Sequence, residues 1–241
     1  MIYASKSETG KRYQNQDVLF VPVRGSVSLF VVADGMGGHN AGSVASRLAT
    51  DTVEAEIKKG GASTPDALLL NAVSAANRAV LAYADSDRNC RGMGTTMVAA
   101  LVFQTKYVVA NVGDSRLYQM ADGILRQVTR DHSYVAELVA AGEITPEQAA
   151  VHPRRNIITR ALGTRNDEKI DIFKREWARG DTLLLCSDGL YGSLDDHEMA
   201  RVLSEAGDDL DFACDTLVRE ALYNGSTDNI SVILIKNKEV R

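Results

Sequence analysis

Five aspartates occur beside short apolar segments that are typical of β-strands, and this placement could bring their carboxylates together. Aspartate is also a good turn residue, so any single one has an ordinary structural explanation. Asp34 and Asp188 are harder to explain in this way, because each follows an almost wholly apolar segment and is itself followed by glycine. The five acids are Asp17, Asp34, Asp114, Asp188 and Asp228.

Carboxylates that converge repel one another unless they are protonated or bound to a cation. At neutral pH a divalent metal ion is the simplest solution. Ligands that are all oxygen atoms favour Mg²⁺, Mn²⁺ or Ca²⁺ over zinc. If the strands that carry Asp34, Asp188 and Asp228 are neighbours, the sequence therefore predicts an acidic metal site.

A glycine-rich segment, residues 35–42, follows Asp34 and opens a helix. It lacks the lysine of a phosphate-binding P-loop, and it does not match the dinucleotide-binding fingerprint GxGxxG. Glycine lets the backbone approach a ligand closely, so the Gly35 carbonyl could bind a metal.

Histidine and cysteine offer weaker candidates. The four histidines have no HxxxH or HExxH spacing, and a surface or structural role is expected for each. His39 is the exception: it lies five residues beyond Asp34 and could therefore stand at the rim of the site. The cysteines are expected to be buried thiols in a reducing cytosol, since they are three and widely spaced. No cysteine has an arginine six residues on, and no DxDx[TV] motif occurs. The residues are His39, His132, His152 and His197, and Cys90, Cys186 and Cys214.

Alternating and β-branched patterns predict the strands that would position the aspartates. They are residues 17–23, 26–33, 95–103, 107–112, 116–120, 124–128, 182–186 and 230–235. Short connections imply antiparallel pairing, with a hairpin turn at Arg24-Gly25. The last two strands are nearly all apolar and are expected to be central.

Helical patterns lie between the strand groups. They cover residues 42–59, 65–84, 195–205 and 210–223, with Thr64 and Pro65 as the start signal of the second. Residues 133–164 differ: two short helices, 134–141 and one that starts at 144–147, interrupt the strands, and long insertions of this kind are often functional. The pattern predicts an α+β fold of two stacked sheets with helices outside. We expect one domain over residues 1–241.

The bulk composition excludes some partners. The net charge is −5 with both signs interspersed, and no basic tract occurs, which disfavours nucleic acid. The N-terminal residues lack the apolar core of a signal peptide, and no apolar run of membrane-spanning length is evident. We expect a cytoplasmic monomer without a membrane partner.

The order of motifs resembles the bacterial branch of the metal-dependent PPM (PP2C-type) protein phosphatases. A single motif would be weak support, but the ordered set spans nearly the whole chain. The motifs are RYQNQD at 12–17, VADGMGGH at 32–39, GTT at 94–96, VGDSR at 112–116, TRDHS at 129–133, LCSDGL at 185–190 and TDNIS at 227–231. The segments at 152–153 and 159–163 resemble the flap beside that family's active site.

The resemblance implies an αββα sandwich with a flap, and a role for each acidic position. Asp34 would bridge two metals, Mn²⁺ or Mg²⁺. Asp188 and Asp228 would complete the first metal's ligands, and the Gly35 carbonyl would bind the second. Asp17 would act through water or in the outer coordination sphere, and Asp114 and Asp188 would lie at a third, weaker metal. Arg12 would hold the substrate phosphate.

The implied activity is removal of phosphate from serine or threonine of proteins, as substrates of a Ser/Thr kinase. Met36 stands where eukaryotic members carry a histidine proposed as the general acid for the leaving group. The identity of this acid is therefore left open, and the alternatives are His39, a metal-bound water or no general acid. Gly10 is also one residue closer to the NQD motif than the family pattern. Two other functions remain alternatives: a catalytically weak metal-binding regulatory module and a phosphoesterase for small molecules.

Overall fold

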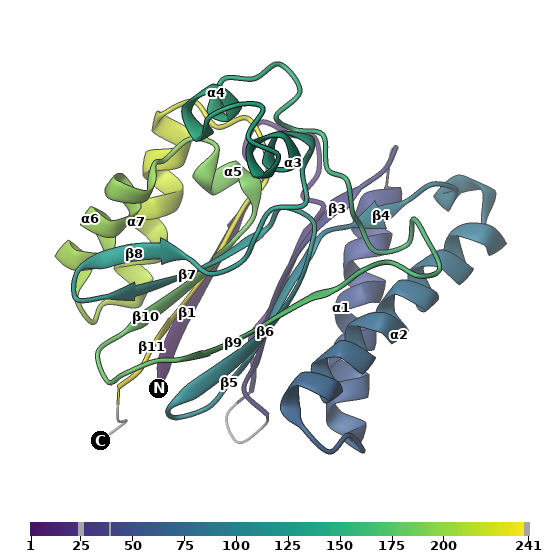
Figure 1. Ribbon diagram of the computed structural model, residues 1–241, viewed down its shortest axis with the longest axis horizontal. Helices are drawn as coiled ribbons and strands as arrows, with labels where there is room; N and C mark the ends of the chain where they lie inside the picture. Colours follow the sequence, from purple (N-terminus) through teal and green to yellow (C-terminus); the bar gives the residue numbers. More distant parts are fainter. Residues whose placement is uncertain (24–26, 39, 239–241) are drawn as a thin grey trace.

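The computed structural model describes residues 1–23, 27–38 and 40–238, and its centre is a pair of stacked antiparallel β-sheets (Figure 1). The five-stranded sheet has the order β1 (Ile2–Glu8), β11 (Ile230–Lys236), β10 (Thr182–Cys186), β7 (Arg116–Ala121) and β8 (Ile124–Gln127). The six-stranded sheet has the order β2 (Asp17–Phe20), β3 (Leu29–Met36), β5 (Met97–Val102), β6 (Lys106–Val112) and β9 (Asp171–Glu176), and β4 (Gly94–Thr95) pairs with β3.

Long helices cover the outer face of each sheet (Figure 1). The pair α1 (Ala41–Lys59) and α2 (Pro65–Ser86) shares a buried apolar core with the six-stranded sheet. The pair α6 (Asp196–Ala206) and α7 (Leu210–Tyr223) shares another with the five-stranded sheet. A one-turn helix, α5 (Asp188–Tyr191), and a short 3₁₀ helix, η1 (Arg88–Cys90), complete the outer layers.

Strand β3 shows why the central strands have no polar face. Leu29, Val31 and Ala33 contact the helix layer, whereas the alternate residues Phe30 and Val32 lie between the two sheets. Successive side chains of a strand point to opposite sides, and here each side is covered, one by helices and the other by the second sheet. Both faces of the strand are therefore buried. The predicted α+β sandwich is confirmed, and β10 and β11 are central as expected.

The long helices begin and end close to the predicted residues. Thr64 caps α2 as expected, because its hydroxyl accepts a hydrogen bond from the Ala67 amide. By length and composition, α2 is apolar enough to cross a membrane, with a mean hydropathy of 1.3, so the expectation of no such segment was wrong in these terms. Core helices pass the same test, and Leu69, Val73 and Val80 of α2 are buried in the core of the sandwich.

One predicted strand pairing was wrong, and two strands were missed. The sequence predicted consecutive pairing of β6 and β7, but β6 pairs with β5 and β9 in one sheet, and β7 pairs with β10 and β8 in the other. The chain crosses between the sheets at residues 113–115, where Gly113 has φ +99°. Strands β1 and β9 were not predicted, because both are edge strands with many polar residues. The predicted hairpin turn at Arg24-Gly25 lies outside the described residues.

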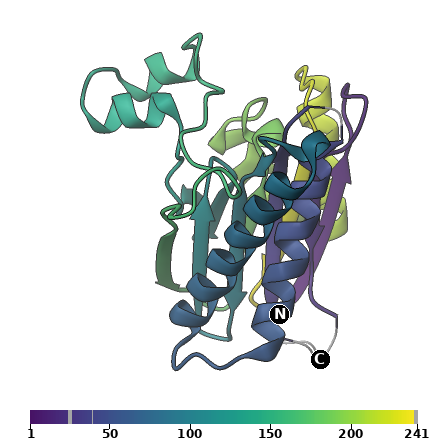
Figure 2. The ribbon, with the colours of Figure 1, turned by 90° about the vertical axis from the view of Figure 1, so that its right-hand side faces the viewer.

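The segment between β8 and β9 forms the expected flap, with helices α3 (Tyr134–Ala140) and α4 (Pro146–Ala150). Figure 2 shows these helices projecting beyond the end of the sandwich. Ser133 and Thr145 cap them, each by accepting a backbone hydrogen bond. At the flap's base, a bridge joins Ser133 to Ile158.

Candidate metal centre

Asp17 and Asp34 face each other across the pair of strands β2 and β3, as register partners in the six-stranded sheet. Asp17 begins its strand, as predicted. Asp34 lies inside β3, which continues to Met36 instead of ending before the acid. The backbone of Asp34 is also fixed from the other side, since its carbonyl accepts from the Thr96 amide at 2.8 Å and its amide donates to the Thr96 hydroxyl at 3.0 Å.

The five-stranded sheet supplies two further acids from neighbouring strands. Asp188 follows the end of β10 and starts α5, and Asp228 lies two residues before β11. Because β10 and β11 are antiparallel neighbours, the end of one strand lies beside the start of the other. The strands that carry Asp188 and Asp228 are therefore neighbours, as the prediction required, whereas Asp34 comes from the other sheet. Asp114 joins them from the crossing between the sheets.

These positions surround one cavity of about 320 Å³. Its wall includes six residues singled out by the sequence: Arg12, Asp34, Gly35, Asp114, Asp188 and Asp228. Asp17 is buried behind this wall, and its Oδ2 accepts a hydrogen bond from the Ser187 hydroxyl at 2.8 Å. His39 lies outside the described residues.

The carboxylates are buried close enough to perturb one another. Burial, followed by the charges of Asp17 and Asp188, raises the pKa of Asp34 well above its usual value. Burial, followed by the charge of Asp114, raises the pKa of Asp188 to about 8. Burial raises the pKa of Asp17 and of Asp114 to about 6. A cluster of this kind carries unfavourable charge at neutral pH unless a cation is bound.

The donor set fits a hard divalent cation. Asp17 Oδ1 and Asp188 Oδ1 are buried and have no hydrogen-bond partner among the described residues, which is costly for carboxylate oxygens without a cation. In residues 1–23, 27–38 and 40–238, however, no three His, Cys, Asp or Glu side chains form a ready-made metal site. Mg²⁺ retains several of its bound waters and needs few protein ligands at each ion. Carboxylates spaced around one cavity are therefore compatible with metal binding.

Two glycines let the backbone close around the cavity. A Cβ on Gly35 would lie 2.1 Å from the Gly42 carbonyl oxygen, so no side chain fits there. Gly10 has φ +63°, and a Cβ on it would lie 2.1 Å from the Asp228 carbonyl oxygen. Gly10, whose spacing from the NQD motif departs from the family pattern, therefore lies in a turn that packs directly on Asp228.

Arg12 lies on the loop before β2, with 59% of its side chain exposed, and its Nη2 donates to Asp228 Oδ2 at 2.7 Å. Asn229 anchors this loop: its side-chain amide donates to the Thr9 and Gln14 carbonyls, and its Oδ1 accepts from the Gln16 amide. Sequence reasoning assigned no role to Asn229, although its position next to Asp228 was a usable signal.

Buried hydroxyls that sequence reasoning missed, together with one histidine, hold the backbone around the site. Ser187 joins the sheets through Asp17, and it also accepts from the Ser231 amide at 3.0 Å. The hydroxyls of Thr96 and Ser115 lie 2.7 Å apart, so the Asp34 strand is connected to the residue after Asp114. His132 has the expected structural role, since its Nδ1 accepts from the Gly113 amide at 3.1 Å. The three cysteines are buried and free, as expected.

The flap borders the same site. Asn156 and Ile158 line the metal cavity from the flap side. A cleft of about 1290 Å³ adjoins this cavity and runs between the flap helices and α5, sharing Asp114, Asn156, Asp188 and Asp228 with it. The wall formed by α3 and α4 is mainly apolar, and Val135, Val139 and Ala149 belong to it.

A two-sheet sandwich with an acidic cavity at one end is the architecture of a class of metal-dependent hydrolases. The family model described as protein phosphatase 2C matches residues 6–219. The chain therefore belongs to the protein phosphatase 2C family, as its motifs predicted, and is a metal-dependent phosphatase.

Relatives and solved structures agree with this assignment. The serine/threonine phosphatase stp of Listeria monocytogenes is 42% identical over 212 residues, which cover 86% of this chain and 84% of that protein. The crystal structure of Stp1 from Staphylococcus aureus superposes with a TM-score of 0.92 and 38% identity, covering 98% of this chain and 95% of that one. The catalytic domain of the phosphatase PstP, solved with two manganese ions, has a TM-score of 0.85 and 35% identity, covering 97% and 96%.

Proposed function

We propose that this protein hydrolyses phosphoserine and phosphothreonine in other proteins, at a site that holds two Mn²⁺ or Mg²⁺ ions. The observation that carries the proposal is the single cavity lined by Asp34, Asp188, Asp228 and the exposed Arg12. The relatives named as serine/threonine phosphatases, and the two manganese ions of one neighbour, support the substrate class and the metal.

In the proposed site, Asp34 would help to hold both ions, Asp188 and Asp228 would supply further ligands to the first, and the Gly35 carbonyl would serve the second. Asp17, whose carboxylate accepts a hydrogen bond from Ser187, would act through water or in the outer coordination sphere. Asp114 and Asp188 would hold a third, weaker ion where the metal cavity opens into the adjoining cleft, since both residues line the two spaces, as Asp228 also does.

Bound divalent cations would supply an activated water and neutralise charge on the transferring phosphoryl group. Arg12 would bind the phosphate, since a guanidinium offers two parallel donors to phosphate oxygens. Its exposed position allows it to meet a phosphorylated side chain entering from solvent. Asp34 and Arg12 would thus carry out catalysis, one by holding metal and the other by orienting the phosphate. His39 at the rim stays a prediction.

Protein substrates are favoured by the cleft beside the metal cavity. At about 1290 Å³, it offers more contact surface than a phosphoryl group alone would use. We propose that a segment of the substrate protein lies in this cleft, beneath the flap. The substrates would be products of a Ser/Thr kinase, and the enzyme would act in the cytoplasm as a monomer.

The test compares a phosphothreonine peptide with p-nitrophenyl phosphate before and after chelation. EDTA should abolish hydrolysis of both, and Mn²⁺ or Mg²⁺ should restore it. Asp34→Asn should lower kcat by several orders of magnitude, because it removes the bridging charge. Undiminished activity after thorough chelation would refute the proposal. Hydrolysis of p-nitrophenyl phosphate but no phosphopeptide would instead indicate a small-molecule phosphoesterase.

A further inference from the structure

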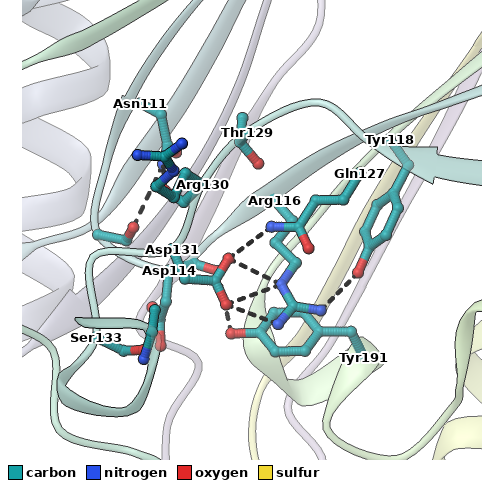
Figure 3. A network of polar contacts seen from close by, with 12 residues as sticks. Asn111, Asp114, Arg116, Tyr118, Gln127, Thr129, Arg130, Asp131, Ser133 and Tyr191 are labelled. Atoms are coloured by element: carbon teal, nitrogen blue, oxygen red, sulfur yellow. Dashed lines mark hydrogen bonds and ion pairs between the residues drawn. The ribbon is translucent and has the colours of Figure 1, made fainter. Parts of the chain in front are cut away.

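Arg116 lies at the centre of a partly buried polar network that joins the metal cavity to the base of the flap (Figure 3). Its Nε donates to both carboxylate oxygens of Asp131, at 3.0 and 3.1 Å, and its Nη2 donates to Asp131 Oδ2 at 2.6 Å. Its Nη1 donates to the Tyr118 hydroxyl at 2.7 Å. The guanidinium is therefore fixed in both position and orientation.

The same guanidinium stacks on the ring of Tyr191, with 3.5 Å between the guanidinium carbon and the ring centre. Tyr191 is the last residue of α5, the one-turn helix that begins with Asp188. Its hydroxyl donates to the backbone carbonyl of Asp114 at 3.0 Å. The ring therefore contacts Arg116 with its face and holds the Asp114 segment with its hydroxyl.

These contacts connect two proposed metal ligands, Asp114 and Asp188, through Arg116 and Tyr191. Asp114 precedes Arg116 by two residues, Arg116 stacks on Tyr191, and Tyr191 belongs to the same helical turn as Asp188. Asp188 Oδ1 has no hydrogen-bond partner among the described residues, so its location depends on where α5 is held. Metal ligands must be held within roughly 0.5 Å of a productive geometry, which makes such a support consequential.

We infer that Arg116 and Tyr191 are a positioning pair that sets the separation of Asp114 and Asp188. This inference rests on the proposed metal site. Each guanidinium nitrogen of Arg116 already donates a hydrogen bond within this network, so the role inferred for it is to position other residues. A lysine could not replace it, since an ammonium group lacks the planar shape that both stacks on a ring and pairs with a carboxylate through two donors.

An ordinary structural role for Arg116 predicts something different. If the residue served only to hold Asp131, and with it the start of the flap, the Tyr191 hydroxyl would be irrelevant to metal binding. The Asp131 contact is shared with Gln127, whose Nε2 donates to Asp131 Oδ1 at 2.7 Å. Removing the Tyr191 hydroxyl therefore distinguishes the two roles, because it affects the Asp114 segment and leaves the contact between Arg116 and Asp131 in place.

The test uses two variants that each remove one hydroxyl beside the same guanidinium. Tyr191→Phe loses the bond to Asp114 and keeps the stacked ring. Tyr118→Phe is the matched control, since its hydroxyl contacts Arg116 on β7 and is not bonded to the Asp114 segment. Mn²⁺ dissociation constants would be measured by calorimetry, with kcat and KM measured over a range of Mn²⁺ concentrations and melting temperatures used to check folding.

We expect Tyr191→Phe to raise the Mn²⁺ dissociation constant of the weakest measurable site by roughly three- to tenfold, the factor that loss of one buried hydrogen bond typically gives. The variant's kcat should fall at low Mn²⁺ and recover at high Mn²⁺, with KM unchanged. Tyr118→Phe should bind Mn²⁺ as the unaltered protein does. Arg116→Lys, if folded, should weaken Mn²⁺ binding at least as much as Tyr191→Phe.

Unchanged Mn²⁺ affinity in Tyr191→Phe, or an equal loss in Tyr118→Phe, would overturn the inference. So would folded Arg116→Lys with normal affinity. If Arg116→Lys does not fold, the two tyrosine variants still decide. An unaltered protein that binds no Mn²⁺ would defeat the proposed function itself, whereas normal binding with an insensitive Tyr191→Phe would defeat only the positioning pair.

Discussion

Arg12 and Asp228 form an ion pair at the rim of the metal cavity, with 2.7 Å between Nη2 and Oδ2. The residue proposed to receive the phosphate is thus paired with a residue proposed to bind metal. Both side chains are partly exposed, and exposed ion pairs contribute only about 0–1 kcal/mol. Arg12 can therefore exchange this carboxylate for a phosphate at little cost, while Asp228 turns to a cation.

Replacement of Arg12 should affect substrate binding more than metal binding. We expect Arg12→Ala to raise KM by roughly 10- to 100-fold, as loss of charged hydrogen bonds typically costs about 1.5–3 kcal/mol. The kcat should fall little if ground state and transition state are held equally. Arg12→Lys should be intermediate, because it keeps the charge and loses the two-donor geometry. Steady-state kinetics with metal analysis would check this, and kinetics like those of the unaltered protein would remove Arg12 from the site.

Stability of the metal-free protein should fall as the pH rises from about 4 to 8. The raised pKa values of Asp17 and Asp114, about 6, and of Asp188, about 8, mean that the folded state binds more protons than the unfolded chain, whose aspartates titrate near 3.8. Unfolding then releases protons, so a higher pH favours it. Melting curves in EDTA between pH 5 and pH 8 would measure the trend.

Bound metal should reverse this loss, because it supplies the missing positive charge. At Mn²⁺ about 100 times its dissociation constant, the gain in unfolding free energy is roughly 2.7 kcal/mol. At a fixed Mn²⁺ concentration, the gain should be larger at pH 8 than at pH 5, since protons compete with metal for the carboxylates and raise the dissociation constant. A melting temperature insensitive to Mn²⁺ at pH 8 would contradict a preformed acidic cluster.

Asp114→Ala should empty only the proposed third metal site. Asp114 lies where the chain crosses between the sheets, and losing one carboxylate should affect a site with few protein ligands most. The variant should keep two bound Mn²⁺ ions and its fold, but lose most of its turnover. A metal titration beside kcat decides the point. Full activity would reduce Asp114 to a residue of the crossing segment and leave two metals sufficient.

Arg154 and Arg155 of the flap should influence protein substrates more than small ones. Arg155 is exposed and lines the large cleft, whereas Arg154 stacks on Tyr134 at 3.9 Å within the flap. The double variant Arg154→Ala/Arg155→Ala should lower kcat/KM for a phosphoprotein by roughly tenfold, the effect of losing one charged contact. Hydrolysis of p-nitrophenyl phosphate should change little.

Single variants separate the two arginines. Arg155→Ala alone should reproduce most of the loss, since Arg155 faces the cleft. Arg154→Ala should act mainly by loosening the flap, which hydrogen exchange of α3 would detect. Equal losses on p-nitrophenyl phosphate and on the phosphoprotein would show that the flap arginines act on catalysis and not on substrate preference.

Local signals were sufficient for much of this protein. The apolar runs of β10 and β11, the Thr64-Pro65 start of α2 and the helix start at 144–147 each act within a few neighbouring residues, so they can be read along the chain. The same holds for the four aspartates that lie at or near strand ends, whereas Asp34 lies inside β3. The ordered motifs also predicted the family, which the comparisons confirmed.

Only the tertiary structure decided how those pieces meet. The register that sets Asp17 opposite Asp34, the crossing at Gly113 that separates β6 from β7, and the edge strands β1 and β9 all depend on pairing between distant segments. The stacking of Arg116 on Tyr191 joins residues 75 positions apart in the sequence. Such contacts depend on packing and hydrogen bonding across the whole fold, because neither residue's sequence neighbours specify its partner. The sequence determined which chemistry was available, and the packing of the two sheets decided which residues carry it together.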